Sequence, residues 1–158
     1  MPTVFLATLG QRPEAITVAL DALSTRFHYE RVGILHTEPH HSGIANALAT
    51  LRPILQDDYP EFAVIYHEIQ FENGKPLIDI TNQHTAEAYY RGMLGLLKDY
   101  IVRGYTVHLM VAGGRKAMSI YATLAASLVF SSRDRVWTVL SSSALIKQRV
   151  FHARGHLA

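Results

Sequence analysis

The feature that most limits the fold of this chain is an alternation of short apolar, β-like runs with longer stretches that repeat apolar residues at helical spacing. The β-like runs occupy residues 3–8, 31–37, 62–66, 106–112 and 136–140. The helical patterns occupy residues 13–23, 44–55, 82–102 and 115–130. Strands that alternate with helices in this way form a mostly parallel sheet covered on both faces. The sequence therefore predicts a Rossmann-like α/β fold with five to six strands.

Turn and capping residues mark boundaries inside this pattern. Pro13 is placed to start the first helix, and Ser42 is the predicted N-cap of the second. Residues 71–80 contain Asn73-Gly74 and Pro76, which predict a turn or a small hairpin. The strands and helices are thus separated by residues that favour a change of direction.

The length of the chain favours one domain. A chain of 158 residues has the usual size of a single domain and buries roughly two-thirds of the surface that its unfolded form exposes. We expect residues 1–158 to form one ligand-binding domain, with a core over about residues 3–142 and a tail over 143–158. Internal repeats and low-complexity segments are not evident.

Composition excludes several classes of protein. No apolar run approaches the ~18 residues that cross a bilayer, so we expect a soluble protein without a membrane partner. The chain has no cysteine, which excludes disulfides and thiolate chemistry and fits a cytoplasmic location. Its net charge of +2, with the nine histidines neutral, is too small for general nucleic-acid binding. An anionic ligand must therefore meet a local cluster of cations.

The strongest local signal is Gly113-Gly114-Arg115-Lys116-Ala117-Met118-Ser119, at a turn from a strand into a helix. The two glycines allow close backbone approach, and the free amides of the helix start favour an anion. Arg115 adds a planar donor, Lys116 a compact charge, and Ser119 a hydroxyl one turn later. The macrodipole disfavours cations at a helix start by ~0.3 to 1 kcal/mol each, so two adjacent cations indicate a phosphate ligand. The alternative is a tight turn with solvated cations.

A second loop, Leu9-Gly10-Gln11-Arg12-Pro13, follows the first strand. Gly10 permits close approach of a ligand to the backbone, and Gln11 and Arg12 project from the loop. Alone it indicates no more than a turn, but both loops leave the carboxyl ends of parallel strands, where open α/β sheets bind ligands. We therefore expect them to face the same crevice. Neither loop has the spacing of a P-loop or of Gly-x-Gly-x-x-Gly, which argues against an ordinary kinase, NTPase or dehydrogenase.

Histidines and tyrosines offer weaker signals. The segment His36-Thr37-Glu38-Pro39-His40-His41 is compatible with a metal site or an acid–base pair, but we expect an exposed polar loop because no fixed ligand spacing is visible. His67 and His108 lie within predicted strands, so we expect them to be structural. Tyr89 and Tyr90 are expected in the core or at an interface.

The two loops together resemble the CRISPR-associated Rossmann fold family, most closely its small ring-nuclease branch. The resemblance rests on Leu6-Ala7-Thr8-Leu9-Gly10-Gln11-Arg12-Pro13 and the loop 113–119, and the order of elements matches over roughly residues 3–142. It implies a homodimer that binds cyclic oligoadenylates, the second messengers of type III CRISPR defence. The resemblance also implies which residues contact the ligand: Gly10, Gln11, Arg12, Gly113, Gly114, Arg115, Lys116 and Ser119.

The resemblance also implies a reaction without metal or other cofactor. The ribose 2′-hydroxyl attacks the neighbouring phosphorus and leaves a 2′,3′-cyclic phosphate end, which destroys the messenger and switches the response off. Lys116 and Arg12 would carry catalysis by positioning and by stabilising charge. Cyclic tetra-adenylate is the expected ring, although the residues do not fix its size. Arg12 departs from the family, where this position is often a small hydroxyl residue. If that hydroxyl orients the attacking ribose in the family, a different group does so here, either Arg12 itself or another residue.

Two alternatives remain open at this point. The first is a sensor domain that binds the ring without cutting it. The second is an enzyme acting on mononucleotides with a metal near His40 and His41. For the homodimer, the small residues Ala117, Ala122, Ala125 and Ala126 allow close helix packing, although burial within one subunit explains them equally well.

Overall fold

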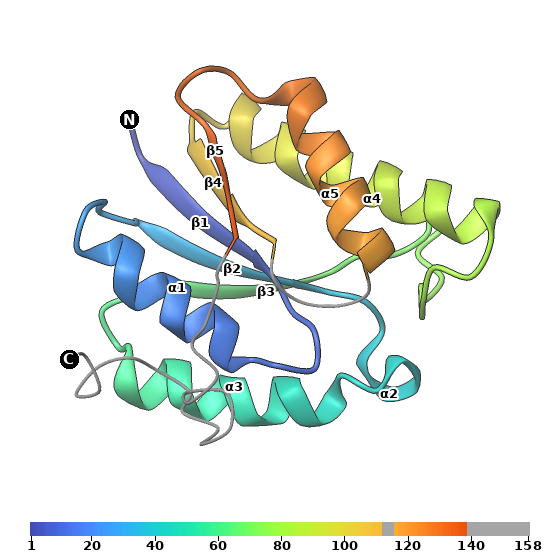
Figure 1. Cartoon of the computed structure of the whole chain (residues 1–158), viewed down its shortest axis with the longest axis horizontal. Helices are drawn as coiled ribbons and strands as arrows, with labels where there is room; N and C mark the ends of the chain where they lie inside the picture. Colours follow the sequence, from blue (N-terminus) through green and yellow to red (C-terminus); the bar gives the residue numbers. More distant parts are fainter. Residues whose placement is uncertain (112–115, 139–158) are drawn as a thin grey trace.

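The computed structural model describes residues 1–111 and 116–138 and confirms the predicted α/β fold (Figure 1). Along the chain the elements are β1 (Thr3–Thr8), α1 (Glu14–Ser24), β2 (Arg31–His36), α2 (Pro39–Ser42), α3 (Ala45–Asp58), β3 (Val64–Glu68), α4 (Gln83–Val102), β4 (Thr106–Met110), α5 (Lys116–Val129) and β5 (Arg135–Trp137). The strands of this described part form one sheet in the order β3-β2-β1-β4-β5, and every neighbouring pair is parallel.

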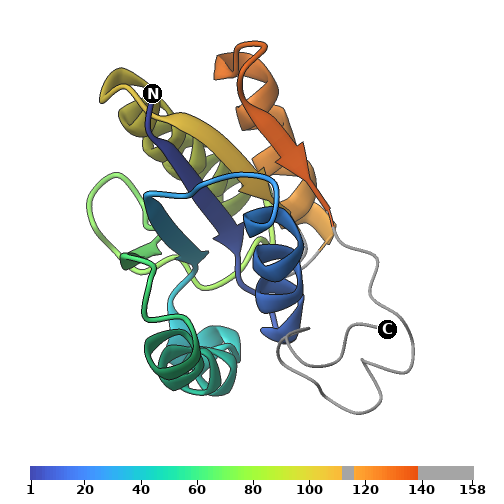
Figure 2. The ribbon, with the colours of Figure 1, turned by 90° about the vertical axis from the view of Figure 1, so that its left-hand side faces the viewer.

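Helices cover both faces of the sheet, with α1 and α3 on one side and α4 and α5 on the other (Figures 1 and 2). Successive residues of β1 point to opposite faces, so Phe5 packs with the α1 and α3 cluster and Leu6 with the α4 and α5 cluster. Burial on both faces explains why the central strand is a continuous apolar run. No helix in the described residues is long and apolar enough to cross a membrane.

One predicted helix start is wrong. Ser42 does not cap α3 but is the last residue of the short helix α2, and α3 begins after Ile44, whose side chain makes no capping hydrogen bond. Glu38 starts α2 because its carboxylate accepts hydrogen bonds from two backbone amides of the next turn. Gly43 then ends α2 with a φ of 83°, in the left-handed region that favours glycine.

The turn predicted over residues 71–80 is confirmed in its first half. Gly74 has a φ of 81°, and the amide of Lys75 donates to Oδ1 of Asn73 at 3.0 Å. Pro76 forms an isolated antiparallel bridge with Gln70. After this turn the chain passes the end of β2, where the carbonyl oxygen of Leu77 accepts a hydrogen bond from the amide of Glu38 at 2.9 Å.

The histidines within strands are structural, as predicted. His108 is 3% exposed, and its Nδ1 lies 2.8 Å from the hydroxyl of Tyr29. His67 places Nε2 2.7 Å from the hydroxyl of Tyr100. Burial holds the pKa of both rings below the ordinary value, and the nearby charge of Arg31 lowers the pKa of His67 further.

These two histidines predict a loss of stability in acid. In the unfolded chain a histidine titrates near 6.5, whereas the folded protein lowers the pKa of His67 and His108, so the unfolded state binds protons more readily. Their contribution to stability is therefore complete above about pH 6.5 and is lost as the pH falls through the lower folded pKa values. Urea unfolding at intervals between pH 8 and 5 should show a falling midpoint.

Variants identify the groups responsible for this acid response. His108→Gln should lower the stability at pH 8 but flatten its decrease toward pH 5, because a titrating ring has been removed. His28→Gln is the matched control, since His28 is exposed. Equal slopes in wild type and His108→Gln would contradict the assignment.

Candidate ligand-binding site

A pocket of about 300 Å³ opens at the carboxyl end of the sheet. Its walls come from the β1–α1 loop, the segment between β2 and α3, the β3–α4 connection and the first turn of α5. Among the described residues it is lined by Leu9, Gly10, Gln11, Arg12, Thr37, Ser42, Ile44, Ile78, Asp79 and Met118. In the sheet, the chain adds β2 and β3 on one side of β1, and β4 and β5 on the other side. The order of strands therefore reverses between β1 and β4, and open α/β sheets bind ligands in the crevice at such a switch point.

The β1–α1 loop supplies one wall. Gly10 is buried, whereas Gln11 and Arg12 are exposed and line the pocket, as predicted from their position after β1. A Cβ atom added at Gly43 would lie 3.7 Å from Nε2 of Gln11, so this side chain leans toward the turn between α2 and α3. Arg12 is exposed and has no carboxylate within 4.0 Å among the described residues.

The start of α5 lines the same pocket as the β1–α1 loop. Met118, in the first turn of α5, lines the pocket with Gln11 and Arg12, which brings parts of the two predicted loops to one crevice. Lys116 is the exposed first residue of α5, and Ser119 is half-buried in the same turn, but neither lines the pocket. The predicted ligand contacts at Gly113, Gly114 and Arg115 lie outside the described residues.

Three polar residues of the pocket were missed in the sequence. Thr37, Ser42 and Asp79 all follow the carboxyl ends of β2 and β3, which is the signal that would have identified them. The hydroxyl oxygen of Ser42 is buried and has no hydrogen-bond partner in the described part of the chain. Asp79 and Arg12 are the ionisable side chains among the described lining residues, so the pocket combines an anion with a cation.

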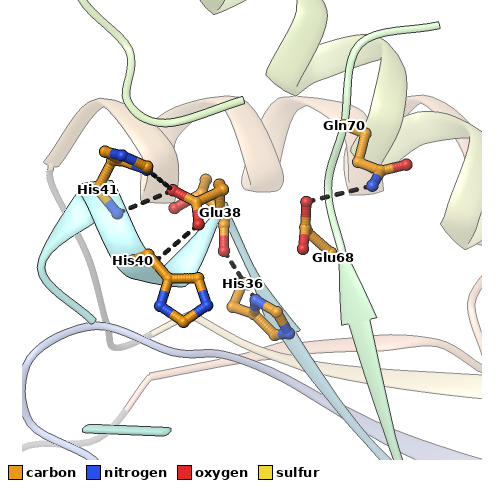
Figure 3. Close-up of polar contacts among 7 residues, drawn as sticks. His36, Glu38, His40, His41, Glu68 and Gln70 are labelled. Carbon is orange, nitrogen blue, oxygen red and sulfur yellow. Dashed lines mark hydrogen bonds and ion pairs between the residues drawn. The ribbon is translucent and has the colours of Figure 1, made fainter. Parts of the chain in front are cut away.

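The histidine-rich segment after β2 is only in part the exposed loop that we expected: His40 and His41 are exposed but belong to the helix α2, and His36 and Glu38 are buried (Figure 3). His36 is 7% exposed and its Nδ1 lies 2.7 Å from the carbonyl oxygen of Thr37. Glu38 is 8% exposed, and its carboxylate accepts hydrogen bonds at 2.8 Å from the amides of His40 and His41. A helix begins at Pro39 because the carboxylate of Glu38, directly before it, accepts hydrogen bonds from first-turn amides that have no partner within the helix.

The carboxylate of Glu38 is also 2.8 Å from Nδ1 of His41. Burial opposes its ionisation, but the amide hydrogen bonds of His40 and His41 and the His41 ring outweigh burial and lower the pKa of Glu38. Glu38 is thus an ionised structural cap rather than a proton donor. No group of three or more histidine, aspartate or glutamate side chains is arranged for a metal in residues 1–111 and 116–138.

Comparison with known proteins identifies a family. The family model described as CRISPR-associated protein NE0113 matches residues 12–155, which is most of the chain. No curated protein matches the chain.

Proposed function

The chain belongs to the CRISPR-associated protein NE0113 family, and from that premise we propose that it binds a cyclic oligoadenylate in this pocket and opens the ring without a metal. The observation that carries the proposal is the guanidinium of Arg12, which pairs with no carboxylate among the described residues, in a pocket at the switch point of the sheet. A planar cation with open donors is well suited to phosphate. The amino end of α5, which favours anions, borders the same pocket through Met118.

The size of the pocket supports a homodimer. At about 300 Å³ it is at the lower end of the range for small-molecule sites, so the described part of one subunit encloses no more than part of a ring of several nucleotides. A two-fold axis would present two such pockets to a symmetric ring. The homodimer is therefore part of the proposal.

Helix α5 offers a surface for the second copy, but not through the alanines considered in the sequence. Ala122, Ala125 and Ala126 are fully buried in the core on the α4 side, so packing within one subunit explains them. The opposite face carries Ile120, Leu124 and Leu128, which are 52%, 50% and 66% exposed. These residues recur at helical spacing and form an apolar stripe. Such a stripe supports contact with a partner.

The proposed reaction is a transesterification within the ring. The ribose 2′-oxygen forms a bond to the adjacent phosphorus while the bond from phosphorus to the 5′-oxygen breaks. The 2′-hydroxyl loses its proton, the 5′-oxygen gains one, and no water is consumed. Arg12 would hold the phosphate, and Lys116 would stabilise the charge that develops on its non-bridging oxygens.

A sensor that binds the ring without cutting it is the second candidate. It is favoured by the position of Lys116, which is exposed at the start of α5 and does not line the pocket. Binding does not require Lys116 to reach a reacting phosphate, whereas cleavage does. The two candidates thus differ in chemistry rather than in the pocket that they use.

Synthetic cyclic tri-, tetra- and hexa-adenylates in excess EDTA test the proposal. We expect one ring to bind and to yield linear products with 2′,3′-cyclic phosphate ends, which mass spectrometry identifies. The same ring with 2′-methoxy groups should stay intact, and light scattering should give the mass of a dimer.

Each other outcome has a distinct meaning. A ring that is bound tightly but remains whole with enzyme in excess would overturn cleavage and leave the sensor. Cleavage that stops in EDTA would indicate a metal-dependent enzyme. Failure to bind any ring would overturn both candidates.

A further inference from the structure

The pocket contains a buried hydroxyl group to which the described fold gives no partner. The Oγ atom of Ser42 is buried and forms no hydrogen bond within residues 1–111 and 116–138, and Ser42 lines the pocket together with Gln11 and Arg12. Such a hydroxyl has lost its hydrogen bonds to water and has gained none from these residues. Buried polar groups of folded proteins nearly always have a partner. A ligand bound in the pocket is placed to supply it.

Other hydroxyl groups in the helices of this chain bond to their own helix. Thr17 donates to the carbonyl oxygen of Glu14 at 3.1 Å, and Thr50 donates to that of Asn46 at 2.8 Å. Ser42 is the last residue of α2, and its hydroxyl makes no such bond. The helix that carries Ser42 therefore does not use this hydroxyl, which leaves it available to a ligand.

The β1–α1 loop brings further hydrogen-bond donors to the pocket. Nε2 of Gln11 lies 3.7 Å from a Cβ atom placed at Gly43, which directly follows Ser42. Arg12 follows Gln11, lines the pocket and has no carboxylate within 4.0 Å among the described residues. A guanidinium only donates hydrogen bonds, and the amide of Gln11 and the hydroxyl of Ser42 can donate as well. Donors grouped with a planar cation suit a phosphate.

We infer that the hydroxyl of Ser42 donates a hydrogen bond to a non-bridging phosphate oxygen of the bound nucleotide. The inference rests on the proposed function and deepens it, because it identifies a second phosphate contact besides Arg12. Rotation about the Cα–Cβ bond moves the oxygen among three staggered positions without a change in the backbone, so the buried hydroxyl can turn toward a ligand. The ribose hydroxyl and the adenine amine are the other groups that a serine oxygen can contact.

Replacing Ser42 by alanine should affect the free protein and the complex differently. The melting temperature of the free protein should stay the same or rise, because no hydrogen bond is lost and alanine is the better helix former. The affinity for cyclic tetra-adenylate, measured in EDTA by rapid mixing before turnover, should fall about 10-fold or more, as expected when a hydrogen bond to a charged group is removed. A residue that only supports the fold would not combine an equally stable free protein with weaker binding.

Two altered rings identify the group of the ligand that Ser42 contacts. The 2′-deoxy ring lacks the ribose hydroxyl, and a ring built from inosine lacks the exocyclic amine. Both rings keep their phosphates, so Ser42→Ala should weaken the binding of each by the same factor as for the natural ring. A contact with the ribose or with the base would instead abolish the effect of the mutation for one of the two rings.

Two further variants are the controls. Ser132→Ala is the matched control for affinity, because Ser132 is exposed on the connection that leads to the amino end of β5, at the edge of the sheet opposite the pocket. It should leave the affinity unchanged. Thr17→Val is the control for melting, because Thr17 is fully buried and its hydroxyl has a partner. It should lower the melting temperature of the free protein.

The outcomes separate this inference from the proposed function. If wild type binds the natural ring and Ser42→Ala binds it equally well, the inference is wrong and the proposed function stands. A lower melting temperature of free Ser42→Ala would assign the hydroxyl to the fold, and loss of the effect with either altered ring would assign it to the ribose or the base. Each of these results would also overturn the inference alone. If wild type binds none of the rings, the inference and the proposed function fail together.

Discussion

Replacing Lys116 by alanine is expected to slow ring cleavage by about 100- to 1000-fold at saturating ligand, the usual cost of removing one donor that stabilises developing charge. The cation meets more charge in the transition state than in the bound ring, so the rate should fall more than the affinity. Single-turnover reactions with enzyme in excess measure this rate directly.

The fold should tolerate Lys116→Ala. Lys116 is exposed at the first position of α5, where its charge opposes the helix macrodipole, and alanine is the better helix former. Lys98→Ala is the matched control, because Lys98 is an exposed lysine within α4 that does not line the pocket. An unchanged single-turnover rate in Lys116→Ala, with cleavage present in wild type, would remove Lys116 from the mechanism.

Gly33→Ala is expected to destabilise the protein by ~1 to 3 kcal/mol, the usual cost of overpacking a core. Gly33 lies in β2, and a Cβ added there would be 2.5 Å from Cδ2 of Leu6 and 3.4 Å from Cδ2 of His67. Leu6 is fully buried in the central strand, so its side chain cannot move into solvent. Urea unfolding at pH 8 measures the change in the free energy of unfolding.

A double-mutant cycle tests the contact itself. Leu6→Val removes the methyl group that a Cβ at position 33 would meet, so Leu6→Val with Gly33→Ala should cost less than the sum of the two single changes. Gly95→Ala is the control, because no atom lies within 4 Å of a Cβ added there. In the interior of α4 that change should stabilise the protein by roughly 0.5 to 1 kcal/mol. Additive costs for positions 6 and 33 would contradict the proposed clash.

The fold was largely predictable because its signals are local. Apolar runs of strand length, stretches of helical spacing and residues such as Pro13 and Gly74 identified the strands and helices of the described chain, apart from the short helix α2. The start of α3 was mistaken because Ser42 has the chemistry of an N-cap. The sequence could not show that Glu38 would take that role one helix earlier, or that Gly43 would end α2.

The pocket was predictable in part, and the reason is geometric. Gly10, Gln11 and Arg12 were identified because a turn after the first strand of an α/β sheet borders the ligand crevice. Asp79 was missed because it lies eleven residues beyond the end of β3, inside a segment whose turn residues explained its composition. Its part in the pocket depends on how the turn at Gly74 returns the chain to the end of β2, where Leu77 pairs with the amide of Glu38.

The sequence by itself determined the alternation of strands and helices, the parallel sheet and the edge of that sheet where a ligand would bind, because each follows from periodicity and from connection rules along the chain. The tertiary structure decided which side chains share the pocket. It placed Arg12, Asp79 and Met118 on the same pocket and left Lys116 exposed outside the lining. Contacts between residues so far apart in the chain depend on strand order and helix packing, which no local pattern encodes.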